Sequence, residues 1–211
     1  MMKPAVSLVP LAVALAFLPG CINRTVTVVP ATSGKVVHLA SGALAEGAQV
    51  TAPGTDVSAT TGPQGEFQLA ALTRKRSEVV LPVSGVYVDG AALMAETGEA
   101  RAYGWTQFIS MSDTAMTDVT LFLIPRGAAF DSSGIPEDCA LEDDEKYALQ
   151  MLAAPPSDAL QAWLDSGIEH GDQLDQLLGI ALVGNLSRRC DVPTAQTRDW
   201  SAQIDALTGQ S

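Results

Sequence analysis

The sequence predicts an α+β protein in which an N-terminal β-sandwich precedes a small helical unit held by a disulfide. Short runs rich in β-branched residues, separated by Gly, Pro, Asp and Ser, occupy residues 34–125. In the last third of the chain, apolar residues recur at helical spacing instead. Two cysteines, Cys139 and Cys190, bracket most of this helical part. We therefore place a sandwich at 34–126 and a helical unit at 137–211.

The N-terminal segment, residues 1–20, has the organisation of an export signal. Lys3 is its only charged residue, an apolar run covers residues 5–17, and the segment leads into Leu18-Pro19-Gly20-Cys21. The apolar run is shorter than the roughly 20 residues that a membrane-spanning helix needs. This pattern favours a signal peptide that is removed on export.

The Leu-x-Gly-Cys ending resembles the lipobox of bacterial lipoproteins. The resemblance implies that residues 1–20 are removed and that Cys21 carries a lipid that holds the protein to a membrane. Because Ile22 rather than Asp follows the cysteine, the family's sorting rule implies the outer membrane in a Gram-negative cell. The alternative is an ordinary signal peptide whose cut falls near Cys21. The Thr- and Val-rich residues 21–33 are expected to form a tether, pairing late as an edge strand.

The sandwich region is predicted from short apolar runs bounded by turn residues. Several such strands with regular turn signals are typical of a sandwich or barrel. The runs are Val36, Val37 and Leu39; Ala48 and Val50; Val57; Phe67 and Leu69; residues 79–83; and residues 119–124.

Part of this region carries recognisable motifs, namely Ser33-Gly34-Lys35-Val36-Val37, Glu46-Gly47-Ala48-Gln49-Val50, and residues 59–69 with Leu72. They resemble the carboxypeptidase regulatory-like module, a transthyretin-type, Ig-like β-sandwich. The resemblance implies a tight hairpin at 62–65 and a non-catalytic folding, binding or spacer unit. Residues 118–125 fit its closing strand loosely. Residues 84–102 depart from it, and we expect them to form an enlarged loop or an extra hairpin.

Four amphipathic patterns predict four helices in the C-terminal third. The first is stopped by Pro155-Pro156, and the second begins at Ser157 as its N-cap. The third is the strongest, and the fourth ends before Gly209. Their apolar faces hold Leu141, Ala148, Met151 and Leu152; Leu160, Trp163 and Leu164; Leu174, Leu177, Leu178, Ala181 and Leu182; and Trp200, Ile204 and Leu207.

The two cysteines that remain after Cys21 are predicted to form one disulfide, since an exported chain meets an oxidising compartment. A bridge between Cys139 and Cys190 closes a loop of 50 residues, which contributes about 4 kcal/mol in the chain-entropy model. It would join the entry of the first helix to the exit of the third. A metal site is the weaker alternative, because the chain has no CxxC spacing.

Charge excludes one class of partner. The chain has 12 Lys and Arg against 24 Asp and Glu, a net charge of -12. So acidic a protein repels phosphate backbones, and nucleic acid is therefore excluded as a partner.

The densest charge cluster lies at the entry of the first predicted helix. Several carboxylates close together suit Ca²⁺, but the spacing is not that of an EF-hand. Acids in a first helical turn also interact favourably with the helix dipole, and we prefer this interpretation. The cluster comprises Glu137, Asp138, Glu142, Asp143, Asp144 and Glu145.

Two histidines are candidates for general acid-base catalysis. Glu169-His170, with Asp172 and Asp175 nearby, is expected to lie in a glycine-bounded connection as an exposed loop histidine. His38, between Val37 and Leu39, is predicted on the outward face of its strand by alternation. No G-x-S-x-G elbow or H-E-x-x-H motif accompanies them.

Aromatic and basic clusters complete the candidates. Tyr103, Trp105 and Phe108 could form a platform for a sugar or peptide, although core packing is commoner for aromatic residues at strand spacing. The basic trio Arg74-Lys75-Arg76 is expected in a solvated turn after Leu72, with a contact to lipid headgroups as the weaker alternative.

These features together predict a non-enzymatic, membrane-anchored envelope lipoprotein. Its sandwich would act as a binding or spacer module, and its helical unit would dock a protein partner in an envelope assembly. We expect no catalytic residue, cofactor or metal. The alternative is a carbohydrate-binding accessory or an envelope hydrolase with a dispersed site.

Overall fold

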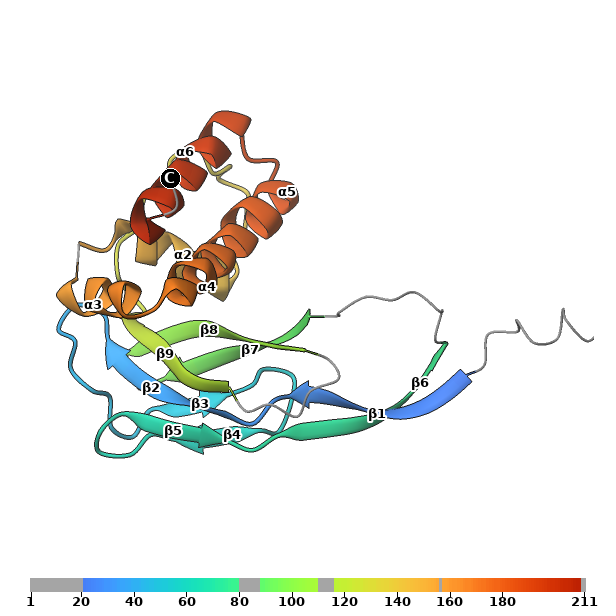
Figure 1. Cartoon of the computed structure of the whole chain (residues 1–211). Helices are drawn as coiled ribbons and strands as arrows, with labels where there is room; N and C mark the ends of the chain where they lie inside the picture. Colours follow the sequence, from blue (N-terminus) through green and yellow to red (C-terminus); the bar gives the residue numbers. More distant parts are fainter. Residues whose placement is uncertain (1–20, 80–87, 110–115, 156, 210–211) are drawn as a thin grey trace, which may run out of the picture.

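The computed structural model describes residues 21–79, 88–109, 116–155 and 157–209. The predicted signal peptide, with the first three residues of the lipobox, lies outside these ranges. The protein is α+β: strands occupy the N-terminal region and helices the C-terminal part, as the sequence predicts (Figure 1). The helices gather over one end of the β-structure, and a long two-stranded ribbon leaves it at the other end.

Nine strands are described. They are β1 Cys21–Val29, β2 Thr32–His38, β3 Gln49–Thr51, β4 Ser58–Thr60, β5 Glu66–Leu69, β6 Leu72–Val79, β7 Val88–Glu96, β8 Ala100–Ile109 and β9 Met116–Pro125. Seven of them form one sheet in the order β4-β3-β7-β8-β9-β2-β5. Its two edge strands, β4 and β5, contact each other, so the sheet is nearly closed.

The segment that departs from the carboxypeptidase regulatory-like pattern lies at the centre of this sheet. Residues 80–87 are outside the described ranges, but β7 and β8 form an antiparallel hairpin from Val88↔Ile109 to Glu96↔Arg101. Of the two forms expected for residues 84–102, the described part is a hairpin. β9 then pairs in parallel with β2, which places the first and last strands of the sheet region side by side.

The other two strands, β1 and β6, pair antiparallel and form the ribbon. Cys21 is opposite Val79 at its tip, and Val29 is opposite Leu72 next to the sheet. Residues 21–29, expected to belong to a tether, are therefore already paired. The solvated turn predicted for the basic trio is wrong, because Arg74 to Arg76 lie within strand β6.

The helices are α2 Asp143–Ala153, α3 Asp158–Ser166, α4 Ile168–Leu178, a π-helical segment η1 Gly179–Leu186, α5 Ser187–Arg189 and α6 Thr194–Thr208. Ser157 caps α3, as predicted, by accepting a hydrogen bond from the backbone N–H of Leu160. α6 ends at Gly209, whose φ of 73° favours glycine. Across the described ranges, no helix has both the length and the apolar character that a membrane crossing requires.

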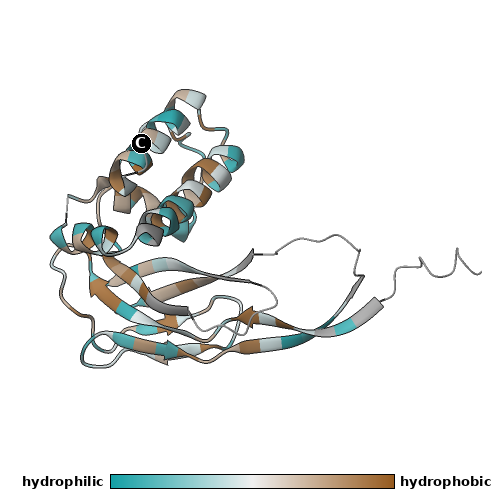
Figure 2. Ribbon diagram, in the orientation of Figure 1, coloured by the Kyte–Doolittle hydropathy of each residue, from teal (hydrophilic) through white to brown (hydrophobic). Residues whose placement is uncertain are grey.

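Sheet and helices share one hydrophobic core. Residues 121–124 of β9 are buried in succession, which means that both faces of this strand are covered. Phe122 packs edge-on against Trp163 of α3, at 5.3 Å between ring centroids. The Tyr147 hydroxyl of α2 donates to the Phe122 carbonyl oxygen at 2.9 Å. Figure 2 shows hydrophobic segments of β2 and β9 beneath the helices.

Candidate functional site

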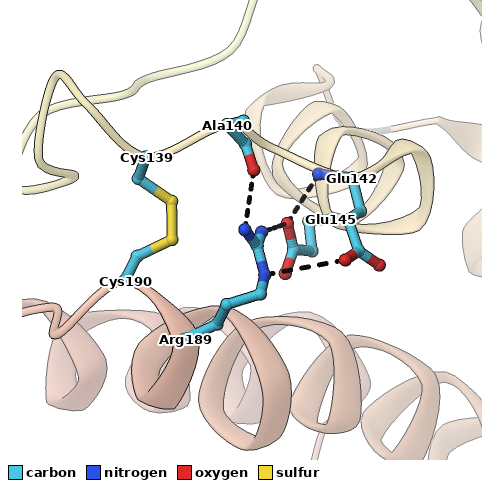
Figure 3. Close-up of a disulfide and its surroundings, with 6 residues drawn as sticks. All are labelled: Cys139, Ala140, Glu142, Glu145, Arg189 and Cys190. Carbon is cyan, nitrogen blue, oxygen red and sulfur yellow. Dashed lines mark hydrogen bonds and ion pairs between the residues drawn. A yellow bond between two sulfur atoms is a disulfide. The ribbon is translucent and has the colours of Figure 1, made fainter.

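The entry of α2 is fixed to the end of α5 by the predicted disulfide and an adjoining arginine (Figure 3). Cys139 and Cys190 are bonded, with their Cα atoms 5.6 Å apart. Beside them, Arg189 forms an ion pair with Glu145, whose side chain is only 1% exposed, and donates to the Ala140 carbonyl oxygen at 2.8 Å. The Glu145 carboxylate also accepts from the Glu142 backbone N–H at 2.7 Å. The first turn of α2 is thereby held in one position.

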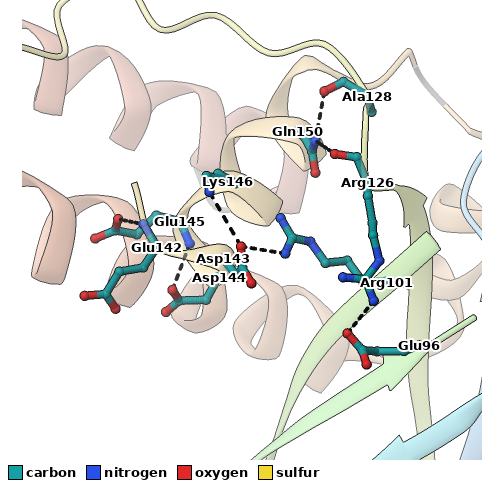
Figure 4. A network of polar contacts seen from close by, with 10 residues as sticks. All are labelled: Glu96, Arg101, Arg126, Ala128, Glu142, Asp143, Asp144, Glu145, Lys146 and Gln150. Atoms are coloured by element: carbon teal, nitrogen blue, oxygen red, sulfur yellow. Dashed lines mark hydrogen bonds and ion pairs between the residues drawn. The ribbon is translucent and has the colours of Figure 1, made fainter. Parts of the chain in front are cut away.

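A second arginine ties the same turn to the sheet (Figure 4). Arg101 of β8 is almost fully buried and donates to Asp143 at 2.8 Å. Hydrogen bonding from Arg101 lowers the pKa of Asp143 below its usual value. Farther along α2, the Gln150 amide donates to the carbonyl oxygens of Arg126 and Ala128. These contacts fix α2 against the strands, so the surface between them has a defined shape.

A groove of about 530 Å³ opens between β8, the first turn of α2, and the α4 and η1 helices. It is the candidate functional site. Three carboxylates and an aromatic pair line it, and none of the described lining residues is Lys, Arg or His. The lining residues are Pro53, Ala92, Tyr103, Gly104, Trp105, Glu142, Asp143, Asp144, Gln176, Leu177, Ile180, Ala181 and Asn185.

The groove combines exposed apolar surface with three carboxylates, of which Glu142 and Asp143 also form ion pairs with cations of the fold. Ile180 is 44% exposed, and among the described residues only Leu44, which does not line the groove, is a comparably exposed large hydrophobic side chain. Trp105 is half-buried and lies over Gly90, where any Cβ would collide with the indole ring. This mixture suits a ligand that presents an apolar group beside a positive charge.

The structure brings two predicted clusters together at this groove. Tyr103 and Trp105 line it, as do three members of the acidic cluster. Phe108, the third aromatic candidate, belongs to strand β8, where it is the partner of Asp89, and its side chain is not described. Glu142 forms an ion pair with Arg189, and Asp143 forms ion pairs with Arg101 and Lys146. The Asp144 carboxylate accepts a hydrogen bond from the Glu145 backbone N–H. In the described parts of the chain, no group of three or more His, Cys, Asp or Glu side chains is arranged to hold a metal ion.

The expected exposed loop around His170 is a helix instead. α4 begins at Ile168 with Gly167 as its N-cap, so His170 and Asp175 lie within it. The His170 ring stacks on Trp163, at 4.4 Å between centroids, and its Nδ1 lies 2.7 Å from the Trp163 carbonyl oxygen. Burial, followed by the charge of Asp205, raises the pKa of Asp175. His170 therefore packs against α3 and does not line the groove.

His38 is the last residue of β2 and is half-buried. Its backbone N–H donates to the Ala43 carbonyl oxygen at 2.8 Å. It does not line the groove either.

Ile180, Gln176 and Asn185 line the groove but were not among the predicted site residues. Ile180 could have been found from its position: it lies outside the i, i+3, i+4, i+7, i+8 series that begins at Leu174. Its side chain is therefore expected to lie away from the main apolar face of the helix. Nothing in the sequence comparably marks Gln176 and Asn185 as site residues. No protein-family model matches the sequence, and no curated protein matches it at a significant level.

Proposed function

We propose that the protein is a lipid-anchored lipoprotein of the bacterial cell envelope, on the outer membrane of a Gram-negative cell, and that its folded part binds a protein partner without catalysis. The observation that carries the proposal is the spacing of two features. Cys21 begins strand β1 of the ribbon, whereas the groove is lined in part by α2, α4 and η1. The ribbon and these helices lie at opposite ends of the β-structure (Figure 1). A lipid on Cys21 would leave the groove facing away from the membrane.

The β-region is proposed to be a transthyretin-type sandwich of the carboxypeptidase regulatory-like class. The motif residues Ala48, Val50, Phe67 and Leu69 are all buried, as the resemblance implies. Residues 62–65 form a turn between β4 and β5, which are not paired in the described register, and Gly65 in this turn has a φ of 68°, which favours glycine. The described register of β8 with β9 holds only Ala100↔Pro125 and Arg101↔Ile124. The two strands are therefore paired at one end only, which is compatible with a division of the sheet into the two layers of a sandwich.

The partner is proposed to insert a segment that carries a Lys or Arg beside an apolar side chain. The carboxylates of Glu142 and Asp144 would attract the cation, and Ile180 and Trp105 would contact the apolar group. Exposed charges of this kind contribute mainly to specificity and association rate, while buried apolar and aromatic contacts contribute most of the affinity.

A photo-reactive amino acid placed at Ile180 is therefore expected to capture an envelope protein in intact cells. Leu44 is the matched control, since it is equally large, apolar and exposed, at 48% against 44%, but lies outside the groove. Sequencing of the cross-linked peptide should reveal a Lys or Arg next to an apolar residue. With the purified partner, Ile180→Asp should weaken binding by about 30-fold, as expected for the loss of a central apolar contact.

The near-isosteric pair Glu142→Gln and Asp144→Asn, which removes two charges from the groove, should weaken binding further at low salt. Equal capture from Ile180 and Leu44, or full affinity in Ile180→Asp, would contradict a partner in the groove. Capture of glycan rather than protein would favour the alternative, in which Tyr103 and Trp105 bind a sugar.

A further inference from the structure

The β1–β6 ribbon concentrates positive charge in an otherwise acidic chain. Its two strands contain Arg24, Arg74, Lys75 and Arg76 against a single acid, Glu78, for a net charge of +3. The rest of the 211-residue chain holds the other 8 basic and 23 acidic residues, a net charge of -15. The charge is therefore strongly segregated between the ribbon and the remainder.

Strand β6 presents Arg74, Lys75 and Arg76 to solvent on both of its faces. Residues 73–77 are all exposed, although successive side chains of a strand point in opposite directions. Neither face of this stretch packs on the sheet or on the helices. Burial in the fold therefore does not explain the presence of three consecutive cations.

The ribbon is also a sheet of its own, because β1 and β6 pair only with each other in the described register. A two-stranded ribbon has little stability by itself. A surface that binds along the ribbon would therefore stabilise it.

The basic stretch also lies close to Cys21. Arg24 and Arg76 are three register pairs from Cys21↔Val79 at the tip, which corresponds to about 10 Å at the usual rise of a strand. Charges within roughly a Debye length, about 8 to 10 Å in physiological salt, interact with a surface without being fully screened. A membrane that holds Cys21 would be within reach of these cations.

We propose that the β1–β6 ribbon binds the phosphate headgroups of an anionic phospholipid surface, through Arg74, Lys75 and Arg76. This inference deepens the proposed function and rests on it for the position of the membrane. The lipid would hold the protein at the membrane, and the ribbon would set its orientation. The positively charged ribbon would lie on the anionic surface, and the groove with its carboxylates would point away from it.

The test uses vesicles and a mature chain, residues 21–211, that carries Cys21→Ser and therefore has no lipid. This chain should bind vesicles of phosphatidylglycerol and phosphatidylcholine better than vesicles of phosphatidylcholine alone, and the preference should vanish in high salt. The triple variant Arg74→Gln, Lys75→Gln, Arg76→Gln should bind the anionic vesicles about 100-fold more weakly, from the usual contribution of each cation near such a surface.

The matched control is Lys35→Gln, Arg188→Gln, Arg198→Gln, which removes three exposed cations from other parts of the molecule. It has the same net charge as the ribbon variant and should bind like the parent. Equal weakening in the two triple variants would overturn the proposal, because net charge alone would then govern binding. Release by inorganic phosphate at constant ionic strength would also overturn it, by identifying a free phosphate site.

Because lipid is absent throughout, this experiment does not depend on the proposed lipid anchor. Failure of the ribbon to bind vesicles would contradict this inference but not the proposed lipid anchor. Absence of a lipid on Cys21 would contradict the anchor but not the measured binding of the ribbon to vesicles.

Discussion

Replacing both Cys139 and Cys190 with Ser is expected to lower the free energy of unfolding by about 4 kcal/mol. The bridge closes a loop across 51 positions, and without it the unfolded chain gains the conformational freedom of that loop. The bond also holds α5 beside the entry of α2, where the Arg189 to Glu145 ion pair forms. Denaturant unfolding of the mature chain, followed by circular dichroism, measures the change.

Cys21→Ser is the matched control for this double variant, because it removes a cysteine outside the bridge and should leave the unlipidated chain equally stable. Reduction of the wild-type protein should reproduce the double variant. A loss below 1 kcal/mol would mean that the described contacts around Arg189, and not the covalent bond, hold this part of the chain together.

Gly34→Ala is expected to cost at least about 3 kcal/mol of stability, at the upper end of what overpacking usually costs. Gly34 is the partner of Val119 in the parallel pair of β2 with β9. A Cβ there would lie 1.9 Å from the Val119 carbonyl oxygen and 3.0 Å from the Phe67 ring. The carbonyl belongs to the backbone of a central strand and cannot move aside as a flexible side chain can. Thermal unfolding of the purified variant measures the effect.

Gly98→Ala is the control for this substitution. Gly98 lies between β7 and β8, has no positive φ, and leaves open space around an added Cβ. It should remain within about 0.5 kcal/mol of the wild type, as most surface substitutions do. A Gly34→Ala protein as stable as Gly98→Ala would show that β2 and β9 do not approach as closely as described.

The sequence predicts the parts of the fold in which one face is buried and the other is not. Phe67 and Leu69 alternate with exposed neighbours in β5, and the series that begins at Leu174 follows one face of α4 and η1. The β1–β6 ribbon escaped prediction because residues 73–77 are exposed on both faces. Without a buried face there is no alternation of apolar and polar residues, and a charged strand resembles a turn.

The groove was harder to predict because its walls come from distant parts of the chain. Pro53, Trp105, Asp144 and Ile180 meet only after the helices dock on the sheet. The aromatic and acidic clusters could each be identified separately, but nothing in their spacing indicates that they face each other. The start of α4 is hard to predict for a local reason: Gly167 is its N-cap, and glycine is common both in turns and at helix N-caps.

The most direct test of the proposed lipid anchor is the mass of the mature N-terminus. The protein is expressed in a bacterial host beside Cys21→Ser, and each form is examined by intact mass spectrometry and detergent partitioning. We expect the wild type to begin at Cys21, to carry the mass of a diacylglyceryl group and to enter the detergent phase, and the variant to do neither. A wild type cut at another residue, without lipid and fully in the aqueous phase, would contradict the anchor.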